Sequence, residues 1–160
     1  MKHVHRLASF FALALLCAPL IAAQGATFHA TLSGKAQSPP IDTPAHGRAT
    51  FVLSSDGQSL SYRLYVADID DVLMAHIHIA PAGQEGPAAV WLYPAHPPAM
   101  EKEGKFTGVL AHGSITAADL RGPLQGKTIA DLVADIKAGN AYVNVHSKAH
   151  PGGEIRGQIH

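Results

Sequence analysis

Apolar and polar residues alternate with period two through most of the chain after residue 45, in short runs divided by turn residues. This alternation places every second side chain on one face, which is typical of strands that bury one face. The runs 48–54 and 59–67 are separated by Ser55-Asp56-Gly57 and predict a hairpin. Further short strands are expected at 75–79, 90–92, 106–115, 142–146 and 154–158.

One section departs from this pattern. After Thr128, apolar residues recur at helical spacing, and Gly139 follows as a typical helix stop. The sequence therefore predicts a mainly β fold, an antiparallel Greek-key-like β-sandwich or barrel, with one short helical insertion near 128–138. An exposed loop is expected at 94–104 and a solvated turn at Asp70-Asp71.

The first 23 residues have the pattern of a secretory signal. Lys2 and Arg6 precede an almost wholly apolar run, and small residues around Ala23 offer a cleavage site. We expect cleavage after Ala23, a single domain over 24–160 with no remaining membrane span, and a periplasmic or secreted location. The alternative is an uncleaved N-terminal anchor.

Composition narrows the function further. Lys+Arg and Asp+Glu both number 12, which excludes a strongly basic nucleic-acid binder. The one cysteine, Cys17, lies in the predicted signal, so the exported domain has no thiolate ligand or nucleophile. Histidine is abundant, with 11 residues.

Three of these histidines fall into a metal-binding pattern. His76 and His78 are separated by one residue on an expected strand, so both leave the core face together. On the strand 142–146, Val143 and Val145 take the core face, which puts His146 on the other. If the two strands are neighbours, the imidazoles converge on an outer patch and could hold a transition metal. Imidazole suits copper and zinc.

A fourth ligand stays open among His150, His46 and Met74, of which the thioether would favour Cu(I). Metal affinity is expected to fall as pH drops through the usual histidine range, because a protonated imidazole cannot ligate.

Two polar residues lie near the predicted patch. Arg156 could attract an anion, or it could pair across strands with Glu154 or an aspartate. Asn144 could orient an imidazole by a hydrogen bond or be an ordinary surface residue. Trp91 is expected to pack rather than bind a ligand.

The chain resembles the CHRD domain, a module named for chordin and found in bacterial secreted proteins. The resemblance spans about residues 28–160. It is carried by Leu32-Ser33-Gly34, Pro39-Pro40, Gly47-Arg48-Ala49-Thr50-Phe51, Leu60-Ser61-Tyr62, Ala75-His76-Ile77-His78, Gly86-Pro87, the run 139–146 and the run 151–159.

A weaker resemblance concerns the order of the histidines. The pair His76 and His78 after a hairpin, the late His146 and an Arg near the C-terminus resemble the copper ligands and arginine of copper-zinc superoxide dismutases. That resemblance implies copper at the three histidines and a catalytic Arg156 drawing superoxide. The dismutase disulfide is absent, and no bridging zinc-site histidine can be placed.

These observations favour an extracytoplasmic β-sandwich that binds one transition metal, with copper as first choice and zinc as alternative. Copper could be stored, carried or cycled in a dismutase-like reaction on superoxide. Two alternatives stay open: a metal that only stabilises the fold, and a metal-free module that binds another protein or a surface. The sequence identifies no protein partner and no nucleic-acid partner.

Overall fold

The computed structural model describes residues 25–160, so the predicted signal, residues 1–23, lies outside it. The described chain contains β1 (Thr27–Ser33), β2 (His46–Leu53), β3 (Ser59–Ile79), β4 (Ala88–Tyr93), β5 (Lys102–Thr116), α1 (Ile129–Lys137), β6 (Ala141–Ser147) and β7 (Ile155–Gln158). Short 3-10 helices lie at Gly34–Ala36, Ala117–Asp119 and Gly122–Leu124.

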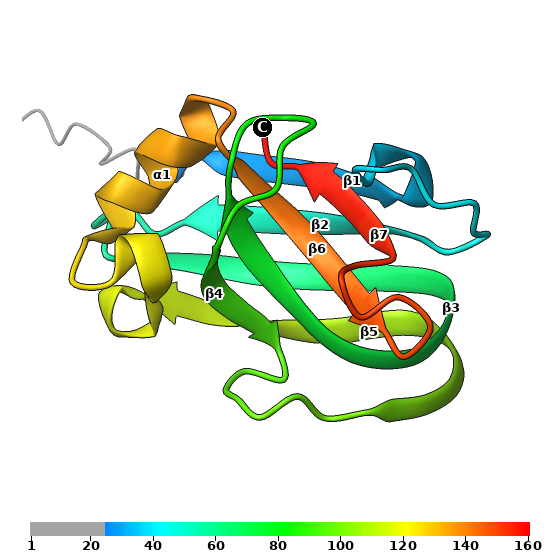
Figure 1. Ribbon diagram of the computed structural model, residues 1–160. Coiled ribbons are helices and arrows are strands. Elements are labelled where there is room, and N and C mark those ends of the chain that lie inside the picture. The colour runs from blue at the N-terminus through cyan, green and yellow to red at the C-terminus, as the bar shows by residue number, and fades with distance from the viewer. Residues whose placement is uncertain (1–24) are drawn as a thin grey trace, which may run out of the picture.

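Five strands close into an antiparallel barrel. β1 pairs with β2, β2 with β3, β3 with β6, β6 with β7, and β7 returns to β1. β4 and β5 each pair with β3 and lie outside this ring. Figure 1 shows β4, β6 and β7 crossing over the layer that holds β1, β2 and β5. The predicted mainly β antiparallel fold with one helix is confirmed.

The 21-residue strand β3 belongs to both layers. Its first half pairs with β2, its second half pairs with β4 and β6, and it bends sharply between them (Figure 1). Asp68 and Asp71 adopt positive φ values of 53° and 46° at this bend. Aspartate tolerates this conformation better than most residues. The prediction of separate strands joined by a turn at Asp70-Asp71 is therefore wrong, because the chain bends without leaving the sheet.

Two other strands differ from the predictions. β1 precedes the first expected strand and completes the ring. β5 begins at Lys102, inside the expected loop 94–104, because the β3 bend offers it partners: Val72 is opposite Lys102 and Asp70 is opposite Lys105. The predicted hairpin is present as β2 and β3.

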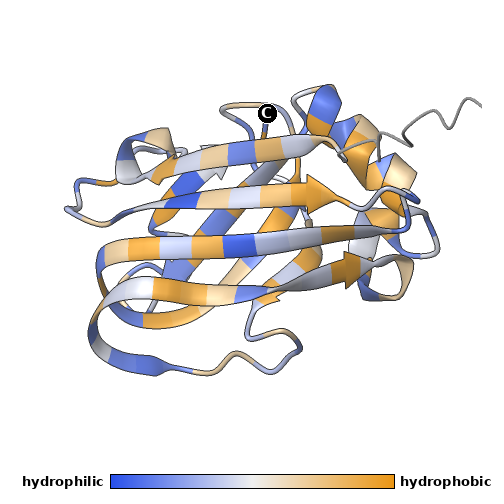
Figure 2. Ribbon diagram, turned by 180° about the vertical axis from the view of Figure 1, so that it is seen from behind, coloured by the Kyte–Doolittle hydropathy of each residue, from blue (hydrophilic) through white to orange (hydrophobic). Residues whose placement is uncertain are grey.

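Alternating burial confirms the period-two pattern. In β3, Leu60, Leu64 and Val66 are 0% exposed, whereas Ser61 and Arg63 face solvent. Figure 2 shows the same alternation of apolar and polar residues along the strands seen from behind. The apolar sides meet inside the barrel and form one core.

Helix α1 closes one end of the barrel, and its boundaries agree with the prediction. The Thr128 hydroxyl accepts from the Asp131 backbone N–H, and the Asp131 carboxylate accepts from the Thr128 N–H. Gly139, with φ of +74°, lies just past the helix end. Within residues 25–160, no helix has the length and apolar character needed to cross a membrane.

Candidate metal site

The second half of β3 presents His76 and His78 on the face that points away from the barrel core. Ile77, between them, is fully buried in the core. β6 runs beside this segment, with Met74 directly opposite His146. Residues directly opposite on paired strands share a face, so His146 lies on the same outer face as the two β3 histidines.

The three imidazoles form a compact group. His76, His78 and His146 each offer a ring nitrogen, and these atoms lie within 4.8 Å of one another. Among residues 25–160, no other set of three His, Cys, Asp or Glu gathers in this way. His76 and His146 are only 4% and 5% exposed, and His78 is half-buried. The structure thus assembles the histidines that the sequence selected, although under cover rather than on an open patch.

Backbone carbonyls fix two of the rings. His78 Nδ1 lies 2.9 Å from the Gly86 carbonyl oxygen, and His146 Nδ1 lies 2.9 Å from the Pro151 carbonyl oxygen. A carbonyl oxygen only accepts, so Nδ1 of each neutral ring carries the proton and Nε2 carries a lone pair. This is the usual way in which a metal-binding histidine is oriented.

The third ring leaves a lone pair without a partner. His76 Nδ1 lies 3.2 Å from His146 Nε2. Because that Nε2 can only accept, His76 donates from Nδ1 and its own Nε2 holds a lone pair. Within residues 25–160, His76 Nε2 and His78 Nε2 are the two buried side-chain nitrogen or oxygen atoms that lack a hydrogen-bond partner. Buried polar atoms rarely stay unsatisfied, because each costs free energy.

Burial keeps these rings neutral. Desolvation is the main cause that lowers the pKa of His76 to about 3, and the neighbouring His146 and His78 lower it further. Desolvation also lowers the pKa of His146 to about 4, although its hydrogen bond to Pro151 opposes the shift. The pKa of His78 is lowered by burial as well, against its hydrogen bond to Gly86. At neutral pH all three are in the form that binds metals.

Aromatic rings line two sides of the group. Trp91 lies opposite His76 on β4, and the two rings meet edge to face with centroids 4.3 Å apart. Tyr142 stacks on His78, with centroids 5.1 Å apart and an interplanar angle of 16°. As expected, Trp91 packs; it does so against a candidate ligand.

Arg156 is buried beside this stack. Its guanidinium carbon lies 3.5 Å from the centre of the Tyr142 ring, and the residue is 2% exposed. One of its N–H groups donates to the Pro81 carbonyl oxygen over 3.4 Å. Neither ion pair found within residues 25–160 includes Arg156, and Glu154 instead accepts the Thr43 hydroxyl at 2.7 Å. The catalytic role of Arg156 stays a prediction.

Asn144 acts on the site through a turn rather than on an imidazole. Its Nδ2 donates to the Gly152 carbonyl oxygen at 3.2 Å, and its Oδ1 accepts from Gln37 Nε2 at 2.8 Å. Both amides are buried, at 4% and 9% exposure. Gly153 has φ of +126°, and a Cβ there would lie 2.3 Å from Asn144 Nδ2. The amides thereby hold the turn that carries Pro151, the anchor of His146.

Sequence reasoning missed Gly86, Pro151 and Gln37 as parts of the site. The first two contribute backbone carbonyls, which leave no side-chain signature. The closest signal was positional, since the turn 151–153 follows His146 and Gly86-Pro87 follows the pair of β3 histidines.

Comparison with known proteins identifies the family of the described domain. The chain is 33% identical over 134 residues to Chordin of Xenopus laevis, a match that covers 81% of this chain but 12% of that protein. The family model of the CHRD domain matches residues 28–159. The chain belongs to the CHRD domain family. No solved structure matches it significantly.

The other histidines of this CHRD domain lie apart from the group. His29, His46, His96, His112 and His160 are exposed, and His150 is half-buried. Of the three candidates for a fourth ligand, His46 and His150 are not among the grouped ring nitrogens. Met74 shares the outer face as the cross-strand partner of His146.

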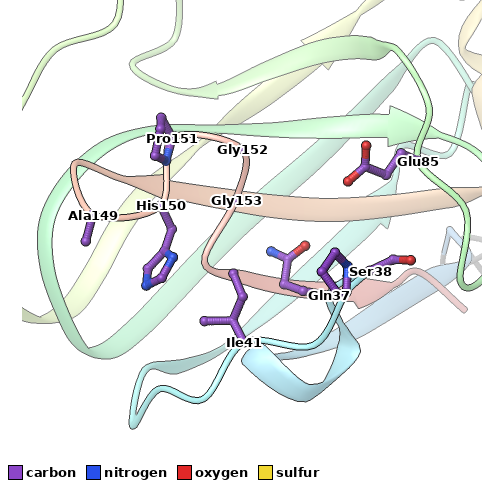
Figure 3. A pocket seen from close by; sticks show the side chains of 10 residues that line it. Gln37, Ser38, Ile41, Glu85, Ala149, His150, Pro151, Gly152 and Gly153 are labelled. Atoms are coloured by element: carbon purple, nitrogen blue, oxygen red, sulfur yellow. The ribbon is translucent and has the colours of Figure 1, made fainter.

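A pocket of about 290 Å³ adjoins the segments that anchor the rings. It is lined by Gln37, Ser38, Pro39, Ile41, Glu85, Ala149, His150, Pro151, Gly152 and Gly153. Figure 3 shows His150 reaching into it from the turn, with Gln37 and Glu85 on other sides. The pocket borders both anchoring segments. Pro151 anchors His146, and Glu85 directly precedes Gly86, which anchors His78.

Proposed function

We propose that this CHRD domain binds one transition-metal ion, with copper as the first candidate, through His76, His78 and His146. The metal is cargo that the domain stores or carries outside the cytoplasm. The observation that carries the proposal is the pair of buried lone pairs without partners, at His76 Nε2 and His78 Nε2, beside a third imidazole. A bound metal ion would satisfy both nitrogens, and His146 Nε2 would become the third donor by giving up the hydrogen bond that it accepts from His76 Nδ1.

The donor set favours copper or zinc over calcium or magnesium. The group consists of neutral imidazoles and includes no carboxylate among the described residues. Such donors suit copper and zinc, whereas carboxylate and carbonyl oxygens suit calcium and magnesium. The Nδ1 anchors at Gly86 and Pro151 support the proposal because they direct Nε2 of two rings toward the group.

Burial favours holding the ion over turning over a substrate. His76 and His146 are nearly inaccessible, and Arg156 is 2% exposed. A dismutase-like reaction would need an open coordination position and a path for superoxide to the metal. A copper-dependent superoxide assay on the loaded protein tests that reading, and we expect no activity above that of the same copper in buffer.

The location outside the cytoplasm rests on residues 1–23, whose composition is that of a secretory signal. N-terminal sequencing of the protein recovered from the medium or periplasm of an expressing host tests this part. We expect the chain to begin at Gln24.

The metal proposal is tested by titrating the secreted protein with Cu(II) under electron paramagnetic resonance, and with Cu(I) against a coloured chelator without oxygen. We expect one copper per chain and nitrogen hyperfine structure, both lost in His76→Ala/His78→Ala. His96→Ala/His112→Ala removes two exposed histidines and is the matched control. Equal binding by the two double variants would refute the proposal.

A second candidate is a metal-free binding module, favoured by the pocket of about 290 Å³ beside Glu85 and His150. Capture of a partner that survives both chelation and His76→Ala would support this function over metal binding.

A further inference from the structure

The three donors of the candidate metal site carry no negative charge. All three grouped donors are imidazoles, and no Asp or Glu within residues 25–160 joins the group. Glu154 accepts the Thr43 hydroxyl, and the carboxylate whose charge reaches the group is that of Glu85, which is exposed at the pocket and acts to raise the pKa of His78 against the lowering by burial. An ion bound here would be balanced only by this solvent-exposed carboxylate, whose charge water screens.

A fixed positive charge already lies beside the donors. The Arg156 guanidinium is 3.5 Å from the centre of the Tyr142 ring, and that ring stacks on His78 with centroids 5.1 Å apart. Arg156 is buried, and neither ion pair in the described part of the chain includes it. Its charge therefore acts on the site with little screening.

The uncharged donors and the buried Arg156 together disfavour a divalent ion more than a monovalent one. The cost of moving an ion out of water grows with the square of its charge, so a divalent ion costs about four times as much as a monovalent one. Repulsion by Arg156 is twice as large for the divalent ion. Neutral nitrogen donors repay this cost less well than carboxylates would.

We propose that the site selects the monovalent cuprous ion, Cu(I), over Cu(II) and Zn(II), with Arg156 as the residue that sets this preference. The inference rests on the proposed function and names its cargo. Cu(I) enters and leaves in the same oxidation state, so no electron moves at the site. Met74 adds a soft thioether to the face of His146.

The test measures the reduction potential of bound copper in the secreted protein, together with separate affinities for Cu(I), Cu(II) and Zn(II). The potential is expected to be more positive than that of copper in excess imidazole in the same buffer. Arg156→Met removes the charge and keeps much of the volume. Loss of one buried unit of charge should shift the Cu(I) to Cu(II) affinity ratio by on the order of tenfold toward Cu(II). That shift lowers the potential by about 59 mV.

Two further variants complete the design. Arg48→Met removes another arginine that faces a tyrosine ring, with its guanidinium carbon 5.2 Å from the Tyr65 ring centre on other strands, and it should leave the ratio unchanged. Arg156→Lys retains the charge and should keep the ratio close to the parent value. If Arg156→Met does not fold, the potential of the parent protein, compared with that of copper–imidazole, still decides whether the site prefers Cu(I).

The outcomes separate this inference from the proposed function. Histidine-dependent binding with a potential at or below that of copper–imidazole, or with Zn(II) bound as tightly as Cu(I), would overturn the inference alone. An unchanged ratio in folded Arg156→Met would overturn the role of Arg156. Copper binding that survives His76→Ala/His78→Ala would overturn the function itself.

Discussion

The two faces of the sheet built by the second half of β3, β6 and β7 are buried to a similar extent but differ in chemistry. The core face carries Ile77, Val143, Val145 and Ile155, each 0% exposed. The outer face carries His76, Asn144, His146 and Arg156, at 4%, 4%, 5% and 2% exposure. Apolar side chains need no partners when buried, whereas every polar atom on the outer face needs one.

The covering segments supply most of those partners. Carbonyl oxygens of Pro81, Gly86, Pro151 and Gly152 accept from the outer-face side chains. Two imidazole nitrogens remain without partners. One face therefore provides the stability of the sheet, while the other is a polar layer with two imidazole nitrogens that a metal ion would satisfy.

The largest expected effect separates the two faces directly. Ile155→Ala opens a cavity on the core face and should lower the free energy of unfolding by about 2–5 kcal/mol. The protein that remains folded should still bind one copper. Urea unfolding and copper titration of the same sample provide the two measurements.

His76→Ala is the complementary change on the outer face. It removes a nitrogen that has no partner but also the donor to His146 Nε2, so the metal-free protein should lose about 1–2 kcal/mol, while copper binding is lost. A core variant that loses copper while folded, or a histidine variant as unstable as Ile155→Ala, would contradict this division between the faces.

The pH dependence of the metal-free protein tests the burial of the polar face. Unfolded histidines titrate near pH 6.5, whereas burial lowers the pKa of His76 to about 3 and of His146 to about 4. The stability is therefore complete above about pH 6.5 and falls below it, because only the unfolded chain takes up protons. The fall continues until pH reaches the folded pKa values. Between pH 7 and pH 5 we expect a loss of roughly 2–4 kcal/mol.

Urea unfolding at pH 7, 6 and 5 measures this loss, with His96→Ala/His112→Ala as a control that should keep the same slope. The same shifts revise the expectation that metal affinity falls through the usual histidine range. In the folded protein, protons should compete with copper only well below pH 6.5. Constant stability from pH 7 to pH 5 would mean that the rings are hydrated.

A smaller effect is expected at the turn that links the faces. Gly153→Ala places a Cβ 2.3 Å from Asn144 Nδ2 at a φ of +126°. We expect a loss of about 2–3 kcal/mol and a several-fold weaker copper affinity, because the turn also carries the Pro151 anchor. Gly83→Ala is the matched control, since Gly83 has φ of +77° and no atom within 4 Å. Its cost should be about 1 kcal/mol, with no change in affinity.

Much of the fold follows from the sequence because its signals are local. Alternation predicts most strands, and Thr128 with Gly139 marks the helix ends. The continuity of β3 could not be predicted, since Asp70 and Asp71 are typical turn residues when considered in isolation. Pairing with β5 across the bend, and with β6 from Val72 onward, keeps that segment in the sheet.

The candidate site likewise has one part that the sequence predicts and another that it does not. The spacing of His76 and His78, with His146 on a later strand, was enough to select the group. Its burial was not predictable, because a polar face that loops cover has the same period-two pattern as a polar face in water. The anchors at Gly86 and Pro151 depend on the folding of those loops.

The last prediction concerns His150, which directly precedes Pro151 and lines the pocket in Figure 3. Its ring is not part of the grouped nitrogens, so His150→Ala should change copper affinity less than about twofold and stability by less than about 0.5 kcal/mol. Trp91, the one tryptophan of the chain, lies 4.3 Å from His76 between ring centroids and gives a fluorescence signal for copper occupancy. A tenfold weaker titration would mean that His150 moves in as a ligand when copper binds. The outer face would then recruit its missing partner from the covering turn instead of being complete before the metal arrives.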